Sequence, residues 1–340
     1  MRKLEFIIRR VTGAIFVLIG VSIITFALAR VVPSNAAALY IGPRARPDDI
    51  ARVEEQLGLN EPLPVQYAVY MRDVLKGDLG TSIGTKRPVT QELMSRLPAT
   101  LELLFVGMFI AIVLGIPLGV ISASHQGKPS DIGVRIVSII GVSVPAFALG
   151  LLLQFLFFRS LDWLPLSGRI DSDMRFLSPV EAITGFYLID TAVTQNWIAF
   201  KDSFWHLILP AITLAAYPMA LIARMTRSTM LEVLTQDYIR TAKAYGIKDR
   251  FIIYAYALKN AIGPTLTVIG LTFAFAITGT FFVEIIFNWP GLGLFTVRSL
   301  LNLDYPAIMG ITLFGAVMYV IINLIVDLLQ AWVDPRITLN

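Results

Sequence analysis

The chain has 340 residues, of which 56% are hydrophobic and 15% are charged, whereas an ordinary soluble domain lies near half and a quarter on these measures. These proportions predict an all-α integral membrane protein. The absence of cysteine excludes disulfides, thiolate zinc sites and thiol nucleophiles. The net charge of +4 leads us to expect no nucleic-acid partner, because basic residues of membrane proteins gather at the cytoplasmic face for topological reasons.

Long uncharged apolar runs set the predicted architecture. A bilayer core of about 30 Å needs about 20 helical residues, so runs of about 18 or more are typical of transmembrane helices. Six runs meet this criterion and predict spans at residues 11–29, 103–124, 136–158, 204–223, 262–283 and 308–326. Prolines within these runs are expected to kink or cap the helices. They are Pro117, Pro145, Pro210, Pro218 and Pro264.

The first run also has features of a secretory signal. Arg9 and Arg10 precede it, and Ala27-Leu28-Ala29 ends it with small residues. Its apolar stretch exceeds the usual core of a signal, so we expect it to remain as the first span.

The distribution of lysine and arginine predicts the orientation. The N-terminal segment 1–10 is basic and is predicted to be cytoplasmic, together with the loops 125–135 and 224–261 and the tail 327–340. The loops 30–102, 159–203 and 284–307 then lie outside. Loop 224–261 is the most basic of all. It carries Arg224, Arg227, Arg240, Lys243, Lys248, Arg250 and Lys259.

The long outer loop 30–102 contains a helix-like piece over residues 47–57. Asp48 or Asp49 suits its first turn, and Gly58 suits its stop. Long loops with structure of their own are usually functional, so we expect the outer loops to contact a partner.

Signs of catalysis are few. Gly80-Thr81-Ser82-Ile83-Gly84 fits the G-x-S-x-G nucleophile pattern, but no strand pattern surrounds it, and we interpret it as a glycine-rich turn. The chain has no G-x-x-x-x-G-K-[ST] phosphate-binding loop, so any ATP that it uses must be bound by another chain. The spans also lack charged residues near their centres, which argues against a proton-coupled carrier.

The polar stretch from Asp237 to Gly246, DYIRTAKAYG, interrupts this apolar chain. Helical spacing places Tyr238, Ala242 and Tyr245 on one face, and Gly246 is expected to end the helix as its C-cap. A second helix is predicted over 248–259, with Phe251, Ala255 and Leu258 on one face. From periodicity alone, a basic amphipathic segment lying on anionic lipid explains the stretch equally well.

Together with the loop around it, this stretch resembles the EAA loop of ABC importer permeases, in the variant of the dipeptide and oligopeptide subfamily. Asp237 stands where the general pattern has glutamate, as is usual in the peptide-type members. Other segments agree with that subfamily along the whole chain. They are Arg9-Arg10, Leu57-Gly58-Leu59, Gly77-Asp78-Leu79-Gly80 with Ser82, Ala99-Thr100-Leu101-Glu102-Leu103, Gly115-Ile116-Pro117-Leu118-Gly119, Arg224-Met225-Thr226-Arg227-Ser228, Leu258-Lys259-Asn260-Ala261 and Trp289-Pro290-Gly291-Leu292-Gly293.

The outer insert contains Ser167-Gly168-Arg169 and residues 185–192 and is most similar to the dipeptide permease branch. Within that branch the chain resembles the first class of permease subunit, the B type. The resemblance implies a type I importer permease with six spans in a bacterial inner membrane, surrounded by lipid and with both termini in the cytoplasm. It also implies three kinds of partner: a second homologous permease, two ATPase subunits that bind ATP and Mg²⁺, and a periplasmic or lipid-anchored peptide-binding protein. The chain itself then holds no cofactor, no metal and no catalytic residue, and its substrate-binding residues remain unassigned.

The resemblance further implies that the polar stretch is a coupling helix seated in an ATPase subunit. Its residues then divide into three groups. Asp237, Arg240 and Lys243 are expected to make polar contacts, and Thr241, Ala242, Ala244 and Gly246 to permit close seating. Tyr238 and Tyr245 either contribute contact area or pack inward. Arg224 and Arg227 are interpreted as topology anchors.

Alternative functions stay open at this point. The same machinery could import nickel, glutathione or sugar-peptides, because selectivity in such systems is largely set by the binding protein. A secondary transporter would show inverted halves around a charged midplane site, and a membrane enzyme would need Ser82 as its nucleophile.

Overall fold

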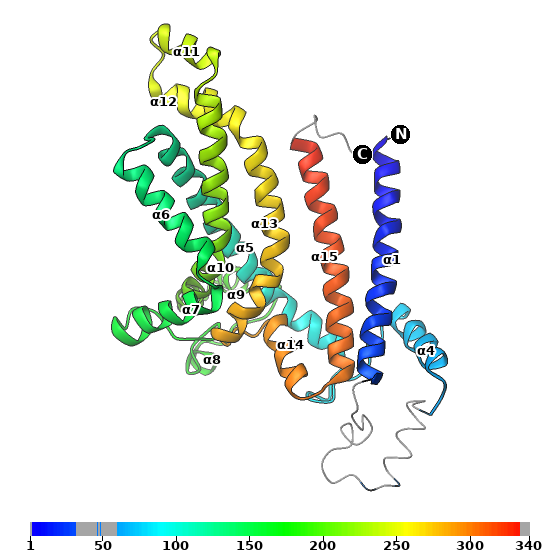
Figure 1. Cartoon of the computed structure of the whole chain (residues 1–340). Helices are drawn as coiled ribbons and strands as arrows, with labels where there is room; N and C mark the ends of the chain where they lie inside the picture. The colour runs from blue at the N-terminus through cyan, green and yellow to red at the C-terminus, as the bar shows by residue number, and fades with distance from the viewer. Residues whose placement is uncertain (1, 32–45, 47, 49–59, 334–340) are drawn as a thin grey trace. The chain divides into compact units, whose positions relative to one another are not determined.

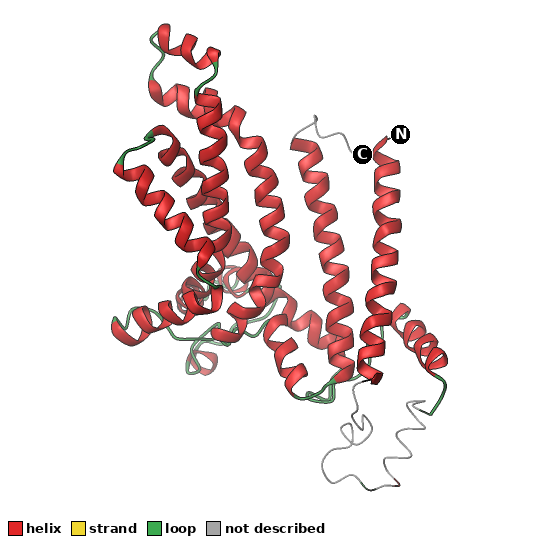
Figure 2. Ribbon diagram, viewed as in Figure 1, coloured by secondary structure: helices red, strands yellow, loops and turns green. Residues whose placement is uncertain are grey.

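The computed structural model describes residues 2–31, 46, 48 and 60–333. In this part of the chain the regular structure is helical, apart from an isolated antiparallel bridge between Thr81 and Pro88 (Figure 2). Five helices are long and apolar enough to cross a membrane, and a bent helix pair supplies a sixth crossing if it is counted as one span. The predicted all-α membrane fold is therefore confirmed. The helix predicted over 47–57 lies outside the described residues.

The chain divides into two compact units, each of which is described by itself. The first unit comprises mainly Met1–Leu97 and Leu294–Ile322, and the second mainly Pro98–Gly293. Every site residue predicted in the polar stretch belongs to the second unit.

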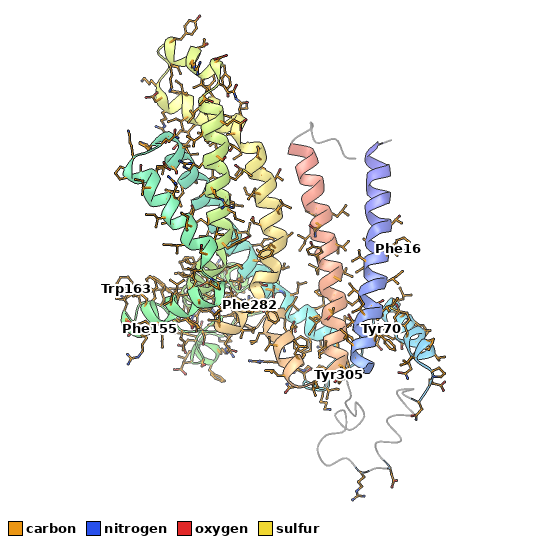
Figure 3. All side chains as sticks on the ribbon, in the orientation of Figure 1. Phe16, Tyr70, Phe155, Trp163, Phe282 and Tyr305 are labelled. Atoms are coloured by element: carbon orange, nitrogen blue, oxygen red, sulfur yellow. The ribbon has the colours of Figure 1, made fainter. Side chains whose placement is uncertain are left out.

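The first unit contains α1 (Arg2–Val31), α4 (Leu63–Leu75) and most of α14 (Leu292–Leu301) and α15 (Tyr305–Val333). Helices α1 and α15 cover the runs predicted as the first and last spans. Helix α4, on which Figure 3 labels Tyr70, packs on α1. The ring of Phe26 contacts Tyr67 and Tyr70 at centroid distances of 5.4 and 6.0 Å. A hydrogen bond of 2.8 Å joins Ser22 Oγ to Tyr67 OH.

The second unit is built on three long helices, α5 (Val89–Ser124), α10 (Trp197–Leu234) and α13 (Lys259–Ile286). Helices α10 and α13 run side by side (Figure 1). A core cluster includes buried side chains from all three, among them Leu103, Leu207 and Val283, together with Phe287 and Trp289 beyond α13.

Helix α5 approaches α10 closely at a glycine. A Cβ atom on Gly119 would lie 2.5 Å from Cβ of Thr226 and 2.7 Å from the carbonyl oxygen of Ala223. Small residues of this kind let the backbones of membrane helices pack against each other. The Gly115-Ile116-Pro117-Leu118-Gly119 segment therefore has a packing role.

The run predicted as one span over 136–158 is broken in the structure. It forms α6 (Pro129–Ser143), α7 (Ala146–Leu153) and a π-helical segment, η1 (Gln154–Ser160), and the two parts of this pair meet at 111°. Pro145 explains the break, because the residue before a proline is driven out of the helical region, and Val144 has φ −82° and ψ 121°. The other prolines named above lie inside α5, α10 or α13.

The outer insert predicted at 159–203 is partly helical, with α8 (Met174–Leu177) and α9 (Tyr187–Val193). Helix α10 begins at Trp197 and therefore takes in the end of that insert. A ring contact also occurs here, between Trp163, beyond η1, and Phe157 at a centroid distance of 6.0 Å.

Two short helices, α11 (Asp237–Ala244) and α12 (Asp249–Phe251), follow α10 and lie together at one end of the second unit (Figure 1). A second π-helical segment, η2 (Ile252–Leu258), joins α12 to α13. The face predicted for residues 248–259 is only partly the buried one: Leu258 packs against a buried cluster that contains Ile252 and Ala257, whereas Phe251 and Ala255 are exposed. A π-helix has more residues per turn than the 3.6 assumed in the prediction, so the buried face shifts.

Candidate functional site

Helix α11 is held by two side chains on its inner face. Ile239 is fully buried, and Ala242 is 6% exposed. Both belong to a cluster with Val120 of α5, Met230 of α10 and Ile252 of η2. Burying one isoleucine stabilises a structure by about 1.5–3 kcal/mol, so Ile239 fixes α11 to the long helices with appreciable energy.

The outer face of α11 is polar and open. The side chains of Asp237 and Arg240 are 96% and 74% exposed, and their ion pair of 3.4 Å is too exposed to stabilise the helix much. Thr241, Lys243 and Ala244 are exposed as well, and Tyr245 is 82% exposed. The helix thus presents a rigid polar surface with one large aromatic side chain at its end.

Gly246 ends α11 in a Schellman motif. Its φ of +70° is in the left-handed region, its N–H donates to the carbonyl of Lys243 at 3.0 Å, and the N–H of Ile247 donates to the carbonyl of Ala242 at 3.2 Å. Ile247 also packs against the cluster that buries Ile239, so the chain reversal brings a second apolar side chain inward. The predicted role of Gly246 as a C-cap is confirmed.

A side-chain contact joins α11 to the start of α13. Asn260 Nδ2 donates to Tyr238 OH at 3.1 Å and to the carbonyl of Tyr256 at 2.7 Å. Tyr238 is 41% exposed, so its ring lies partly against the chain while its hydroxyl group is bound. Of the two outcomes foreseen for the tyrosines, Tyr238 packs inward in part and Tyr245 remains exposed.

A buried ion pair fixes the same end of α10. Arg227 Nε donates to Asp131 Oδ1 at 2.8 Å, and its NH2 group donates to Oδ2 at 3.0 Å. Asp131 is 1% exposed and also accepts from Ser122 Oγ and from the Gly127 N–H. The pair ties the start of α6 to α10 and to the end of α5. Arg227 therefore has a specific structural partner in addition to its predicted topological role.

At the other end of the second unit, two segments singled out in the sequence meet. Trp289 Nε1 donates to the carbonyl of Ala99 at 2.8 Å, and the Leu292 N–H donates to Thr100 Oγ1 at 2.8 Å. Thr100 Oγ1 donates in turn to the carboxylate of Glu284, which is fully buried. Residues 99–103 and 289–293 thus form one hydrogen-bonded assembly.

Arg169 joins this assembly from the outer insert. Its guanidinium group is paired with Glu102, and its side chain is 6% exposed. The same group lies 3.7 Å from the ring centroid of Tyr187 and donates to the carbonyl of Gly185. The insert is therefore attached to α5 by a buried charge pair with an aromatic cover.

A carboxylate organises the turn that precedes α9. Asp190 accepts hydrogen bonds from the backbone N–H groups of Ile183, Thr184 and Gly185 and from Thr184 Oγ1. Burial opposes its ionisation, but these donors outweigh burial and lower the pKa of Asp190 below its ordinary value.

In the first unit, Ser82 lies in a buried turn. Its Oγ donates to Asp304 Oδ2 at 2.5 Å and accepts from the Thr85 N–H at 3.0 Å. Asp304 also accepts from the Gly84 N–H, so the carboxylate holds the whole turn. These partners give Ser82 a structural role, in agreement with the interpretation of residues 80–84 as a glycine-rich turn.

Comparisons with known proteins match nearly the whole chain. Residues 115–339 match the family described as "Binding-protein-dependent transport system inner membrane component", and residues 3–104 match its N-terminal counterpart. The chain belongs to this family of inner membrane permease components. The predicted resemblance to ABC importer permeases is thereby confirmed.

Three relatives show how close the similarity is. The probable D,D-dipeptide transport system permease protein DdpB of Escherichia coli K12 is 45% identical over 97% of this permease and 96% of its own length. The dipeptide transport system permease protein DppB of Alkalihalophilus pseudofirmus is 44% identical over 98% and 99%. The oligopeptide transport system permease protein AppB of Bacillus subtilis is 39% identical over 98% of both chains.

A solved structure shows the same fold. A chain of the MetNI methionine ABC transporter in an inward facing conformation matches with a TM-score of 0.50 and 16% identity, and covers 69% of this permease and 93% of that chain. At this identity the match speaks for the fold alone, which is the predicted type I importer permease fold.

The structure corrects one residue role in the permease and adds others. Ala242 was expected to let a partner approach, but it is buried within its own chain, because helical spacing pairs it with Ile239 on the inner face. The sequence reasoning missed the packing role of Ile239 and the side-chain partners of Asn260 and Asp131. Ile239 is the one large aliphatic residue between Asp237 and Gly246, which is a usable signal, whereas Tyr238 and Arg227 lie 22 and 96 residues from their partners Asn260 and Asp131.

Proposed function

We propose that this permease is the transmembrane subunit of an ATP-driven, binding-protein-dependent importer of dipeptides or short oligopeptides. The observation that carries the proposal is the arrangement of α11, whose inner face is buried in its own chain while Asp237, Arg240, Lys243 and Tyr245 remain open at the end of the long helices. Such a helix offers a fixed surface to which another protein can bind. The names of the relatives DdpB, DppB and AppB support the class of substrate.

In this proposal α11 is the coupling helix, and its partners are two ATPase subunits that bind ATP and Mg²⁺. A second homologous permease completes the path, and a periplasmic or lipid-anchored binding protein delivers the peptide. Closure of the ATPases on ATP displaces α11, and the helices attached to it switch between inward-open and outward-open states. The permease contributes the translocation path and the coupling helix α11, and the ATPases hydrolyse ATP.

The composition of the complex is the first test. The permease is tagged, solubilised gently from its native membrane, and its partners are identified by mass spectrometry. We expect a second permease and P-loop ATPases in stoichiometric amounts. A permease that purifies alone even after mild cross-linking would refute the proposed complex and favour a lipid-surface role for α11.

The orientation is tested independently. Because the chain has no cysteine of its own, single cysteines at Val193 and Lys248, both exposed in the structure and both outside the proposed contact with the ATPases, report the orientation. A membrane-impermeant maleimide is expected to label V193C in intact cells and K248C only after permeabilisation. The reverse pattern would place α11 outside and exclude contact with cytoplasmic ATPases.

A further inference from the structure

A groove of about 540 Å³ lies between α10 and α13, away from the surface of α11. Residues of α10 that recur at helical spacing line one side, among them Tyr217, Arg224 and Ser228, and Thr272 and Phe275 of α13 line the other. The lining is mostly apolar, and none of the residues that form it is acidic. No role assigned so far to the permease uses this groove.

The groove has two chemically different ends. The rings of Tyr217 and Phe275 contact each other at a centroid distance of 5.5 Å, which sets one end. Helices α10 and α13 run antiparallel, as the Tyr217–Phe275 contact shows together with the contact of 3.3 Å between Thr226 Oγ1 and Thr265 Oγ1. Arg224 and Ser228 therefore lie toward the other end of the groove. At a rise of 1.5 Å per residue, the stretch from Tyr217 to Ser228 is roughly 16 Å long.

Arg224 differs from Arg227, although both lie on α10 one turn apart. Arg227 is bound to the buried Asp131 on two atoms. Arg224 is exposed along the groove, and within the described part of the chain its guanidinium group has neither an ion pair nor a hydrogen bond. Arg224 directly follows the predicted span 204–223, so its charge lies at the predicted cytoplasmic end of a mostly apolar groove and is available to an anionic group.

We propose that this groove is a transit site for the transported peptide, in which Arg224 binds the C-terminal carboxylate. The inference rests on the proposed function and adds a substrate contact to it. A guanidinium group binds a carboxylate through two parallel hydrogen bonds, and the Ser228 hydroxyl group lies on the same helix one turn further. A dipeptide extends over roughly 7 Å, so it fits between the ends of the groove.

The opposite end suits the rest of a short peptide. The aromatic faces of Tyr217 and Phe275 attract an ammonium group or pack against an apolar side chain. The apolar walls between the two ends do not select among the side chains of the peptide. The site therefore binds the terminal group that all short peptides share and accepts different side chains. Such limited recognition suits a pathway that must also release the peptide.

Transport by the complete complex provides the test. The permease and the partners that co-purify with it are reconstituted into vesicles, and uptake of radiolabelled alanyl-alanine is measured beside ATPase activity stimulated by the loaded binding protein. We expect R224A to lower uptake at least about tenfold, the effect of losing a charged hydrogen-bonded pair. R224K, which keeps the charge, is expected to recover much of the uptake, and ATPase stimulation is expected to stay near wild type in both.

A second measurement separates binding from structural support. A photoreactive phenylalanine analogue placed at Leu221, which lines the groove, should capture labelled alanyl-alanine when Arg224 is present and lose most of the capture in R224A. Equal capture in the two backgrounds, or unchanged uptake by R224A, would overturn the transit site. Loss of complex assembly in both R224A and R224K would also overturn it, because the arginine would then be structural.

The lipid composition of the vesicles shows whether Arg224 binds a peptide carboxylate or the headgroup of an anionic phospholipid. If R224A and wild type differ only in vesicles that contain anionic phospholipid, Arg224 binds a lipid headgroup and the transit site is refuted. A wild-type complex that neither imports alanyl-alanine nor shows stimulated ATPase activity would refute the proposed function itself. If instead wild type imports the peptide and R224A imports it equally well, only the transit site is refuted and the proposed function stands.

Discussion

Replacement of Gly246 gives a graded test of how firmly α11 must be held. At φ +70° an L-residue costs about 1–2 kcal/mol, asparagine tolerates this conformation better than other residues, and a β-branched residue tolerates it least. No atom lies within 4 Å of a Cβ built on Gly246, so the cost arises from the backbone and not from a clash. A cost of that size changes the ratio of closed to frayed turn by about 5- to 30-fold.

The expected order of peptide uptake follows from this conformational cost. G246N should lie close to wild type, G246A should be intermediate, and G246I should be nearly inactive, because the hydrogen bonds to Lys243 and Ala242 open and Ile247 leaves its cluster. Uptake is measured in cells whose own copy is deleted and is normalised to the amount of permease in the membrane. Equal uptake by G246I and G246N would refute the reasoning, since the two differ mainly in their tolerance of positive φ.

Three further changes test the packing of the second unit. R227A leaves the buried Asp131 uncompensated and should lower the stability of the solubilised permease by about 3–5 kcal/mol in thermal unfolding, whereas R224A should have little effect on it. G119A should cost about 1–3 kcal/mol, because its Cβ would overlap Thr226, and G133A, where no atom lies within 4 Å, serves as the neutral control. Asp190 has a lowered pKa, so its stabilisation of residues 183–190 is present at neutral pH and is lost as the pH falls through the ordinary range for aspartate toward that lowered pKa. The protection of these amides from hydrogen exchange, measured relative to the intrinsic exchange rate at each pH, should fall on acidification in wild type and already be low at neutral pH in D190N.

The sequence predicted the elements whose signal is local. Apolar runs located the long helices, because the bilayer imposes a length that composition reveals directly. Gly246 was recognised as a C-cap because the residues that define a helix end are adjacent in sequence. The polar stretch was placed on a helix for the same reason.

The failures have a different physical origin. The run 136–158 is uniformly apolar, so hydropathy does not reveal that Pro145 turns the chain by 111°. The predicted faces of residues 238–245 and 248–259 were wrong or incomplete, because periodicity assumes an ideal α-helix, and in the first case the burial of Ile239 is decided by helices α5 and α10. The pairs Asp131–Arg227 and Glu102–Arg169 join residues far apart in sequence, and no single segment carries a sign of them.

These contacts determine which helices move when α11 is displaced. Ile239 is buried in a cluster drawn from α5, α10, η2 and α13, so a displacement of α11 cannot be absorbed by one helix alone. The pair of Asp131 and Arg227 adds α6 to the same body at this end. The helical path from α6 to α7 is interrupted at Val144, whose backbone is extended, and a helix break next to a proline is where a change of φ and ψ meets the least resistance. We therefore expect the joint between α6 and α7 to bend while α5, α10 and α13 move together. A cross-link between α10 and α13 that lies outside the groove should preserve uptake, whereas fixing the α6–α7 joint should reduce it.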